Sequence, residues 1–189
     1  MKVYLAGPEV FLSNARVILA RKAELARAAG FTPLVPGDLA IPETDGKRAR
    51  GVAISRVNEG MMREADLIVA NLTPFRGISA DVGTVFELGF MAGLGRPVYA
   101  YSNSDRGYFE RALHDYYGGA SVKRPDGATA GPDGMSIEDF DMADNLMLDG
   151  GIESRGGVFV RRSVPEIERS TSLEAFEACL AIAAQRLLA

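Results

Sequence analysis

The stretch Asp81-Val-Gly-Thr-Val-Phe-Glu87-Leu-Gly-Phe-Met-Ala-Gly-Leu-Gly95 predicts a helix that is apolar around most of its circumference. Asp81 is a favourable N-cap, and Gly95 is a favourable stop. Between Asp81 and Arg96 the only ionisable side chain is that of Glu87. A carboxylate among apolar neighbours loses hydration unless another group compensates. We therefore interpret Glu87 as a buried carboxylate with a chemical role, rather than as a solvent-facing residue of an amphipathic helix.

Strand and helix patterns alternate along the first 117 residues. Strands are predicted for four short apolar runs, at residues 3–6, 31–35, 66–71 and 97–101, of which the second is broken by Pro33. Helices are predicted by apolar periodicity and capping residues, at 14–30, 47–65, 81–95 and 109–117. This alternation predicts an α/β fold with a doubly wound, flavodoxin- or Rossmann-like parallel sheet and helices on both of its faces.

Ligands of such folds bind beyond the carboxyl ends of the strands. Three loops are expected to meet there, at residues 7–12, 36–46 and 72–81. In the first helix, the buried face is expected to carry Ile18, Leu25 and Ala29. Residues 118–136 are rich in Gly, Pro, Ser and Asp, which predicts a flexible excursion.

The composition of the 189 residues is that of an ordinary globular protein, with 47% hydrophobic and 24% charged side chains. We expect residues 1–189 to form one domain, whose last helix begins at Ser172. The net charge of −4 argues against a nucleic-acid or membrane-surface partner, which would require a basic face. Because the chain has one cysteine, Cys179, and no run typical of a signal peptide or a membrane span, we expect a cytoplasmic protein.

Several kinds of catalytic site do not fit the residues present. The chain has no Gly-x-Gly-x-x-Gly turn and no Walker loop. Its one histidine, His114, lacks the setting of a Ser-His-Asp triad, and one histidine with one cysteine cannot form a zinc cluster. Carboxylates therefore remain as the candidate reactive groups, and we expect neither a metal nor a cofactor.

A glutamate carboxylate can attack the anomeric carbon of a sugar and form a covalent glycosyl ester, which a second acceptor displaces with overall retention. This chemistry needs an ionised carboxylate held by a hydrogen-bond donor. The phenol of Tyr4 can donate to Glu87 and keep its charge available. Asp81 has two interpretations, as a simple helix cap or as a second functional carboxylate stabilised at the helix start.

The chain resembles the nucleoside 2-deoxyribosyltransferase family in four places. The matching features are Val3-Tyr4-Leu5-Ala6-Gly7-Pro8 with Phe11, Ala65-Asp66-Leu-Ile-Val-Ala, Asp81-Val-Gly with Glu87-Leu-Gly89, and Asp144-Asn145. They extend from residue 1 to about residue 150, and their combination is specific. The resemblance implies transfer of 2-deoxyribose between the nucleobases of 2′-deoxynucleosides by double displacement, without a cofactor.

The same resemblance implies a role for each matching residue. Glu87 would be the nucleophile at C1′, Tyr4 would orient it, and Asp81 would bind the sugar 5′-hydroxyl and take part in proton transfer. Asn145 would reach the 5′-hydroxyl in the site of a neighbouring subunit, which implies a homo-oligomer. Further substrate contacts are implied for Asn58 near the sugar and base, Phe11 against the deoxyribose, Asp38 in the loop beside the base, and Gly7.

Two other functions are compatible with these residues. A 2′-deoxynucleoside 5′-monophosphate N-glycosidase shares the Glu-Leu-Gly helix but carries Ser where this chain has Asp81. A carboxylate at that place would repel a 5′-phosphate, whereas it accepts a hydrogen bond from a neutral 5′-hydroxyl. A non-catalytic nucleotide-sensing module could keep the pocket without a reactive Glu87. Asp81 therefore favours the transferase.

Overall fold

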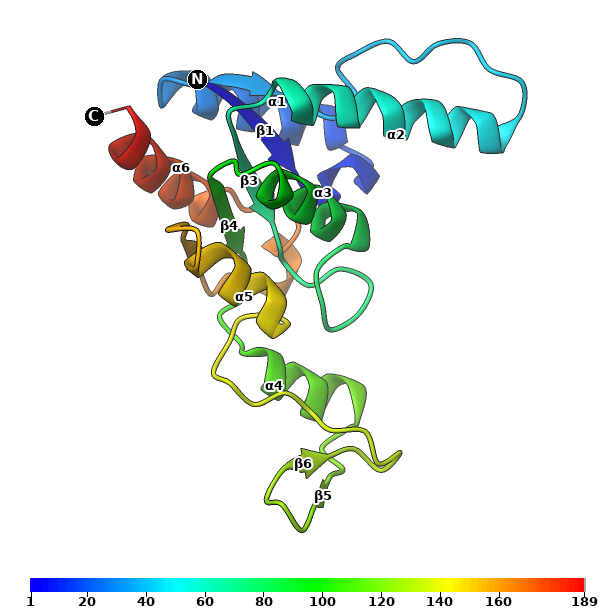
Figure 1. Cartoon of the computed structure of the whole chain (residues 1–189), viewed down its shortest axis with the longest axis vertical. Helices are drawn as coiled ribbons and strands as arrows, with labels where there is room; N and C mark the ends of the chain where they lie inside the picture. The colour runs from blue at the N-terminus through cyan, green and yellow to red at the C-terminus, as the bar shows by residue number, and fades with distance from the viewer. Residues whose placement is uncertain (189) are drawn as a thin grey trace.

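The computed structural model describes residues 1–188 and has at its centre a five-stranded sheet whose neighbouring strands all run parallel. In spatial order the strands are β2 (Thr32–Leu34), β1 (Lys2–Ala6), β3 (Leu67–Asn71), β4 (Val98–Ser102) and β7 (Phe159–Arg161). The chain order reverses between β1 and β3, and doubly wound sheets bind ligands at such a switch point. The predicted α/β fold with a doubly wound parallel sheet is confirmed (Figure 1).

Helices cover both faces of the sheet (Figure 1). One face carries α1 (Ala15–Ala28) and α6 (Glu174–Leu187). The opposite face carries α2 (Lys47–Glu64), α3 (Val82–Gly93) and α5 (Leu146–Glu153). All residues of β3 and β4 are buried between these layers, which accounts for their apolar sequences up to the polar last residues, Asn71 and Ser102. Among the helices described within residues 1–188, none has the length and apolar character needed to cross a membrane.

The alternation of side chains along β1 directs Tyr4 to the face that α3 covers. Val3 and Leu5 pack in one apolar cluster with α1 and α6, whereas Tyr4 and Ala6 pack in the other with α2 and α3. Successive side chains of a strand point to opposite faces, so a register shift of one residue would move Tyr4 away from α3. The pairing of Tyr4 with Ile68 of β3 therefore sets the position of the Tyr4 hydroxyl.

Cys179 lies in the core between α6 and the sheet. Its side chain is fully buried, and its Sγ contacts the carbonyl oxygen of Ala100 at 3.4 Å. Burial raises the pKa of the Cys179 thiol to about 12. This residue is therefore a packing residue and does not contribute a reactive thiol.

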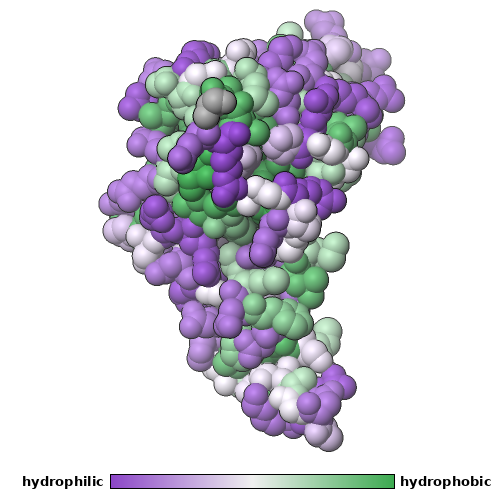
Figure 2. All heavy atoms as spheres, turned by 60° about the vertical axis from the view of Figure 1, so that its left-hand side comes forward, coloured by the Kyte–Doolittle hydropathy of each residue, from purple (hydrophilic) through white to green (hydrophobic). Residues whose placement is uncertain are grey.

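Residues 105–140, here called the arm, project from the body of the molecule (Figure 1). The arm contains a short helix, α4 (Tyr108–Arg111), which continues as a π-helical turn, and a ribbon of two antiparallel strands, β5 (Val122–Lys123) and β6 (Thr129–Ala130). Figure 2 shows apolar side chains gathered on this narrow part of the molecule. The short helix predicted at 109–117 is confirmed, and the excursion predicted at 118–136 contains the ribbon, while its flexibility stays a prediction.

Two features of the last third of the chain differ from the sequence-based expectation. The last helix begins at Glu174, and Leu173 rather than Ser172 occupies its N-cap. The carbonyl of Ser172 instead accepts a hydrogen bond of 2.9 Å from Asn103 Nδ2, which holds Ser172 in the preceding turn. Strand β7 was not predicted, because its apolar run, residues 158–160, is only three residues long and is followed directly by Arg161 and Arg162.

Candidate active site

The hydroxyl of Tyr4 donates a hydrogen bond of 2.6 Å to Glu87 Oε1. Tyr4 extends from the sheet and Glu87 from α3, so this bond joins the two elements beside the switch point of the fold. Tyr4 is fully buried, but Glu87 is only partly buried, which corrects the expectation of a buried carboxylate. The reason is that the outer face of α3 is open, with Val82 83% and Phe86 57% exposed.

Three influences act on the protonation of Glu87. Burial is the largest and raises the pKa of Glu87 to about 7, the hydrogen bond from Tyr4 opposes this rise, and the negative charge of Asp81 adds to it. Burial, followed by the charge of Glu87, raises the pKa of Tyr4, so its phenol stays protonated as a donor. A carboxylate with a pKa near 7 changes charge close to neutral pH, as many catalytic acids and bases do.

Asp81 occupies the N-cap of α3, as predicted. Its Oδ2 accepts hydrogen bonds from the backbone N–H of Thr84 at 2.9 Å and from the Thr84 hydroxyl at 3.1 Å. Within residues 1–188 no hydrogen bond reaches the other oxygen, Oδ1, which is therefore available to a ligand. The two interpretations of Asp81 are compatible, because one oxygen caps the helix and the other is not needed for capping.

Phe11 belongs to an aromatic cluster at the carboxyl edge of the sheet, formed by the loops that follow β1 and β3. Its ring is 55% exposed and stacks on Phe75 with 5.3 Å between the ring centroids. The guanidinium of Arg76 lies over both rings, 5.0 Å and 4.7 Å from their centroids. Phe75 and Arg76 are not among the predicted site residues. Their position in the loop at 72–81 is the one feature of the sequence that points to them.

Asp38 and Asn58 line a cleft of about 750 Å³ between α1 and α2. Asp38 comes from the loop after β2, and Asn58 comes from α2, next to Ile54 on the same wall. The structure thus brings these two predicted substrate contacts together. The residues that line this cleft do not include Tyr4 or Glu87.

Gly7 has a packing role in addition to its predicted place near the substrate. A Cβ at this position would lie 1.9 Å from Glu9 Oε2 and 2.9 Å from the Cβ of Asn71. Glu9 is buried, and its Oε1 accepts hydrogen bonds from Lys22 Nζ (2.7 Å), the Tyr101 hydroxyl (2.8 Å) and Asn71 Nδ2 (3.0 Å). Burial by itself would raise the pKa of Glu9, but the charge and hydrogen bond of Lys22 outweigh it and lower that pKa. Gly7 therefore makes room for a buried ion pair.

Asn145 is the N-cap of α5, where its Oδ1 accepts a hydrogen bond of 3.1 Å from the backbone N–H of Met147. Its Nδ2 donates a hydrogen bond of 2.6 Å to Glu138 Oε1 in the arm. Within one protomer, the hydrogen bonds of the Asn145 side chain therefore join α5 to the arm and do not involve Tyr4 or Glu87.

Comparison with known proteins identifies the family. The sequence model of the nucleoside 2-deoxyribosyltransferase family matches residues 3–147, a range that contains Tyr4, Asp81 and Glu87. The chain belongs to this family. The resemblance seen in the sequence is confirmed, and this member of the nucleoside 2-deoxyribosyltransferase family is an enzyme of deoxyribosyltransferase type.

Individual relatives of this deoxyribosyltransferase-family chain match along most of its length. An uncharacterized protein of Schizosaccharomyces pombe is 29% identical over 179 residues, which cover 89% of this chain and 85% of that protein. The structure of a 2-desoxiribosyltransferase from Leishmania mexicana has 29% sequence identity, a TM-score of 0.67 and coverage of 98% of both chains. The structure of a conserved protein from Enterococcus faecalis V583 has 22% identity, a TM-score of 0.58 and coverage of 99% of both chains, and it shares the fold.

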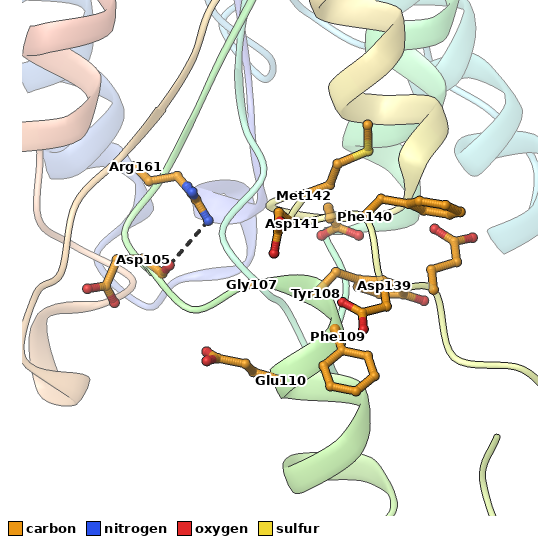
Figure 3. A pocket seen from close by; sticks show the side chains of 12 residues that line it. Asp105, Gly107, Tyr108, Phe109, Glu110, Asp139, Phe140, Asp141, Met142 and Arg161 are labelled. Carbon is orange, nitrogen blue, oxygen red and sulfur yellow. Dashed lines mark hydrogen bonds between the residues drawn. The ribbon is translucent and has the colours of Figure 1, made fainter. Parts of the chain in front are cut away.

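A hollow of about 350 Å³ lies between the arm and the body of this deoxyribosyltransferase-family protein (Figure 3). Its lining is rich in carboxylates from the arm and from the segment before α5, and one of these carboxylates is Asp144. Arg161 points toward the arm and donates a hydrogen bond of 3.3 Å to the carbonyl oxygen of Asp105 (Figure 3). Across residues 1–188 no group of three or more His, Cys, Asp or Glu side chains is arranged to hold a metal ion.

Proposed function

We propose that this protein transfers 2-deoxyribose from one nucleobase to another, by double displacement through a covalent deoxyribosyl ester of Glu87. The observation that carries the proposal is the hydrogen bond of 2.6 Å from Tyr4 to Glu87, on a helix that Asp81 caps. Glu87 is held in place, partly accessible and, with a pKa of about 7, ionised in a substantial fraction of molecules at neutral pH. A nucleophile at an anomeric carbon needs these properties.

The reaction is proposed to proceed in two displacements at C1′. Because Glu87 Oε1 accepts the hydrogen bond from Tyr4, Oε2 is the oxygen that attacks. The new C1′–O bond forms as the C1′–N bond breaks, and the departing base takes the electron pair and a proton, which is supplied by water. A nitrogen of the incoming base then attacks C1′, the ester bond breaks, and the Glu87 carboxylate is regenerated as the incoming base loses a proton. Two inversions give overall retention.

The remaining predicted residues are proposed to hold the nucleoside. Asp81 accepts a hydrogen bond from the 5′-hydroxyl through Oδ1 and takes part in proton transfer, and Phe11, whose ring is largely exposed, packs against the deoxyribose. The backbone at Gly7 borders the sugar. Asn58 and Asp38 contact the base from the cleft between α1 and α2.

A homo-oligomer is proposed in which Asn145 serves the site of a neighbouring subunit. Three large apolar side chains on α3 and α5 support this proposal: Val82, Phe86 and Met147 are 83%, 57% and 71% exposed. Clusters of exposed apolar side chains mark interaction surfaces in soluble proteins. A second copy that covers this face would bury them and bring its own Asn145 toward a 5′-hydroxyl next to Glu87.

The proposed reaction is tested with purified protein, 2′-deoxyinosine and free adenine, and products are separated by chromatography. The Leishmania mexicana relative is named for deoxyribosyl transfer, which supports the choice of this reaction. We expect deoxyadenosine and hypoxanthine to form in equal amounts. Deoxyinosine monophosphate is incubated in parallel without an acceptor base. If hypoxanthine and deoxyribose phosphate form from the monophosphate while deoxyinosine yields no product, the protein is an N-glycosidase and the proposed transfer is wrong.

The pH profile of base exchange is expected to depend on Tyr4. Exchange should increase with pH through about 7, because only ionised Glu87 attacks C1′. Tyr4→Phe removes the hydrogen bond that lowers the pKa of Glu87, so the midpoint of the profile should move to higher pH. Loss of one charge-assisted hydrogen bond should also reduce the rate at neutral pH about tenfold. The measurement is kcat/KM for deoxyinosine from about pH 5 to about pH 9.

Tyr117→Phe is the matched control for this substitution. Tyr117 also donates to a carboxylate, Asp133 Oδ2 at 2.8 Å, but the pair lies exposed in the arm. The pH profile of kcat/KM for Tyr117→Phe should match that of the wild type. An unchanged midpoint in Tyr4→Phe would contradict the assigned role of Tyr4.

A further inference from the structure

Arg111 and Asp144 form a buried ion pair where the arm meets the body of the molecule. Arg111 Nη2 lies 3.3 Å from Asp144 Oδ2, and the two side chains are 4% and 1% exposed. The guanidinium also donates to three backbone carbonyls, of Ile78 (2.7 Å), Ala143 (2.7 Å) and Arg106. These carbonyls belong to the loop before α3, to the segment before α5 and to the arm itself. One side chain therefore ties three segments together.

Asp144 binds the backbone next to Asp81 and the backbone of Asn145, the two residues that are proposed to bind the 5′-hydroxyl. Its Oδ2 accepts a hydrogen bond of 3.0 Å from the backbone N–H of Ala80, the residue directly before Asp81. Its Oδ1 accepts a hydrogen bond of 2.8 Å from the backbone N–H of Asn145. A single buried carboxylate thus holds the backbone beside Asp81 and the backbone of Asn145.

Stability alone does not explain an ion pair at this place. Burial disfavours both charges: it lowers the pKa of Arg111 and raises the pKa of Asp144, despite their mutual attraction. Well-packed apolar side chains often stabilise a protein as much as a buried ion pair of similar volume does. The ion pair differs from an apolar contact in its geometry, because the guanidinium fork and the two carboxylate oxygens hold backbone groups in defined directions.

We propose that Arg111 and Asp144 are positioning residues that set the 5′-hydroxyl end of the substrate pocket, through Ala80 for Asp81 and through the backbone of Asn145. The inference rests on the proposed function, from which the roles of Asp81 and Asn145 are taken. It also gives the arm a part in the reaction, because α4 supplies Arg111. In the proposed oligomer, Asp81 binds substrate in its own subunit and Asn145 binds substrate in a neighbouring subunit. The ion pair, which contacts the backbone beside both residues, therefore connects two sites.

Asp144→Asn tests the inference, because an amide has only one acceptor oxygen and cannot accept from both Ala80 and Asn145. With 2′-deoxyinosine as donor, kcat/KM for exchange should fall about tenfold or more. With 2′,5′-dideoxyinosine, which lacks the 5′-hydroxyl, wild type and variant should differ by less than about threefold. Equal losses with both donors would indicate a general structural defect and would overturn the inference.

Arg111→Lys keeps a positive charge opposite Asp144 but loses the fork that holds the carbonyls. It provides a second test in case Asp144→Asn does not fold, which circular dichroism detects. For Arg111→Lys we expect the same fall in kcat/KM with 2′-deoxyinosine, and little change with the donor that lacks the 5′-hydroxyl. Wild-type rates with both donors would overturn the inference.

Arg124→Ala is the matched control in the arm, where Arg124 forms an exposed ion pair with Asp126 at 3.7 Å. Its rates with both donors should equal those of the wild type. A selective loss as large as that of Asp144→Asn would show that any disturbance of the arm suffices, and it would overturn the assignment to the buried pair. Exchange by the wild type is measured first. If the wild type does not exchange bases, the proposed function and this inference both fail. If the wild type exchanges bases but the variants lose activity equally with both donors, only this inference fails.

Discussion

Glu87→Gln is expected to reduce base exchange at least about a thousandfold while the fold stays intact, because a nucleophile is lost. The amide has the shape of the carboxylate and still offers an oxygen to the Tyr4 hydroxyl, which lies 2.6 Å from Glu87 Oε1. It carries no negative charge, so it cannot displace a base from C1′. The measurements are exchange of deoxyinosine with adenine and the circular dichroism spectrum of the variant.

Glu59→Gln is the matched control, because Glu59 is also a helical glutamate but pairs with Arg63 at 3.5 Å on the surface of α2. It should exchange bases at the wild-type rate. Mass spectrometry of wild-type protein quenched during turnover should find deoxyribose on the peptide that contains Glu87. Near-wild-type turnover by Glu87→Gln, or an adduct on a different residue, would contradict the proposed nucleophile.

Lys22→Met is expected to lower the free energy of unfolding by about 3–5 kcal/mol, the usual result of removing one partner of a buried ion pair. Lys22 and Glu9 are both almost fully buried, 2.7 Å apart, and the ammonium group lies 4.9 Å from the centroid of the Phe176 ring. Met has a similar length and no charge, so the main loss is that of the cation beside Glu9. Urea denaturation followed by circular dichroism measures the effect.

The pH dependence of stability should change sign in this variant. In the wild type Lys22 lowers the pKa of Glu9, so the pair contributes stability above the ordinary pKa of a glutamate, about 4.3, and loses it as pH falls through the lower folded-state pKa. Without the cation, burial raises the pKa of Glu9 in the folded state. Protonation then relieves a buried charge, and Lys22→Met should become more stable as pH falls from 7 toward about 5.

Two companion variants separate this ion pair from general effects. Arg21→Met removes a neighbouring ion pair with Glu24 that is exposed, and it should change the free energy of unfolding by less than about 1 kcal/mol. Adding Glu9→Gln to Lys22→Met removes the unpaired charge and should restore part of the lost stability. No recovery in the double variant would show that packing, and not the unpaired carboxylate, accounts for the loss.

The Tyr4–Glu87 contact could be predicted from the sequence because both residues lie in strongly patterned elements. The apolar run at 3–6 predicted a buried strand, and the residues from Asp81 to Gly95 predicted a capped helix with one acid. In a parallel α/β fold such a helix packs on one face of the sheet, and the face that α3 covers is the one that carries Tyr4. The sequence did not reveal that Glu87 is partly exposed, because the exposed positions Val82 and Phe86 are apolar and look like core residues.

The buried charges could not be predicted, since their partners are distant in the sequence. Ile18 and Leu25 of α1 and its C-cap Ala29 are only partly buried. The buried residues of this helix are Lys22, Ala23 and Ala26. Lys22 follows Arg21 and precedes Glu24 by two residues, which is typical of a solvated helix face, and nothing local indicates Glu9 as its partner. The same holds for Arg111 and Asp144, which lie 33 residues apart and meet only after the arm has turned back to the body.

The burial of Cys179 has a practical consequence for fluorescence studies. A thiol reacts as the thiolate, and with a pKa of about 12 the Cys179 side chain contains almost none at neutral pH. A cysteine introduced at the exposed Ser121 in the arm would therefore be the one thiol that a maleimide dye modifies. The emission of that dye could report the environment of the arm during turnover in a chain that is otherwise unaltered.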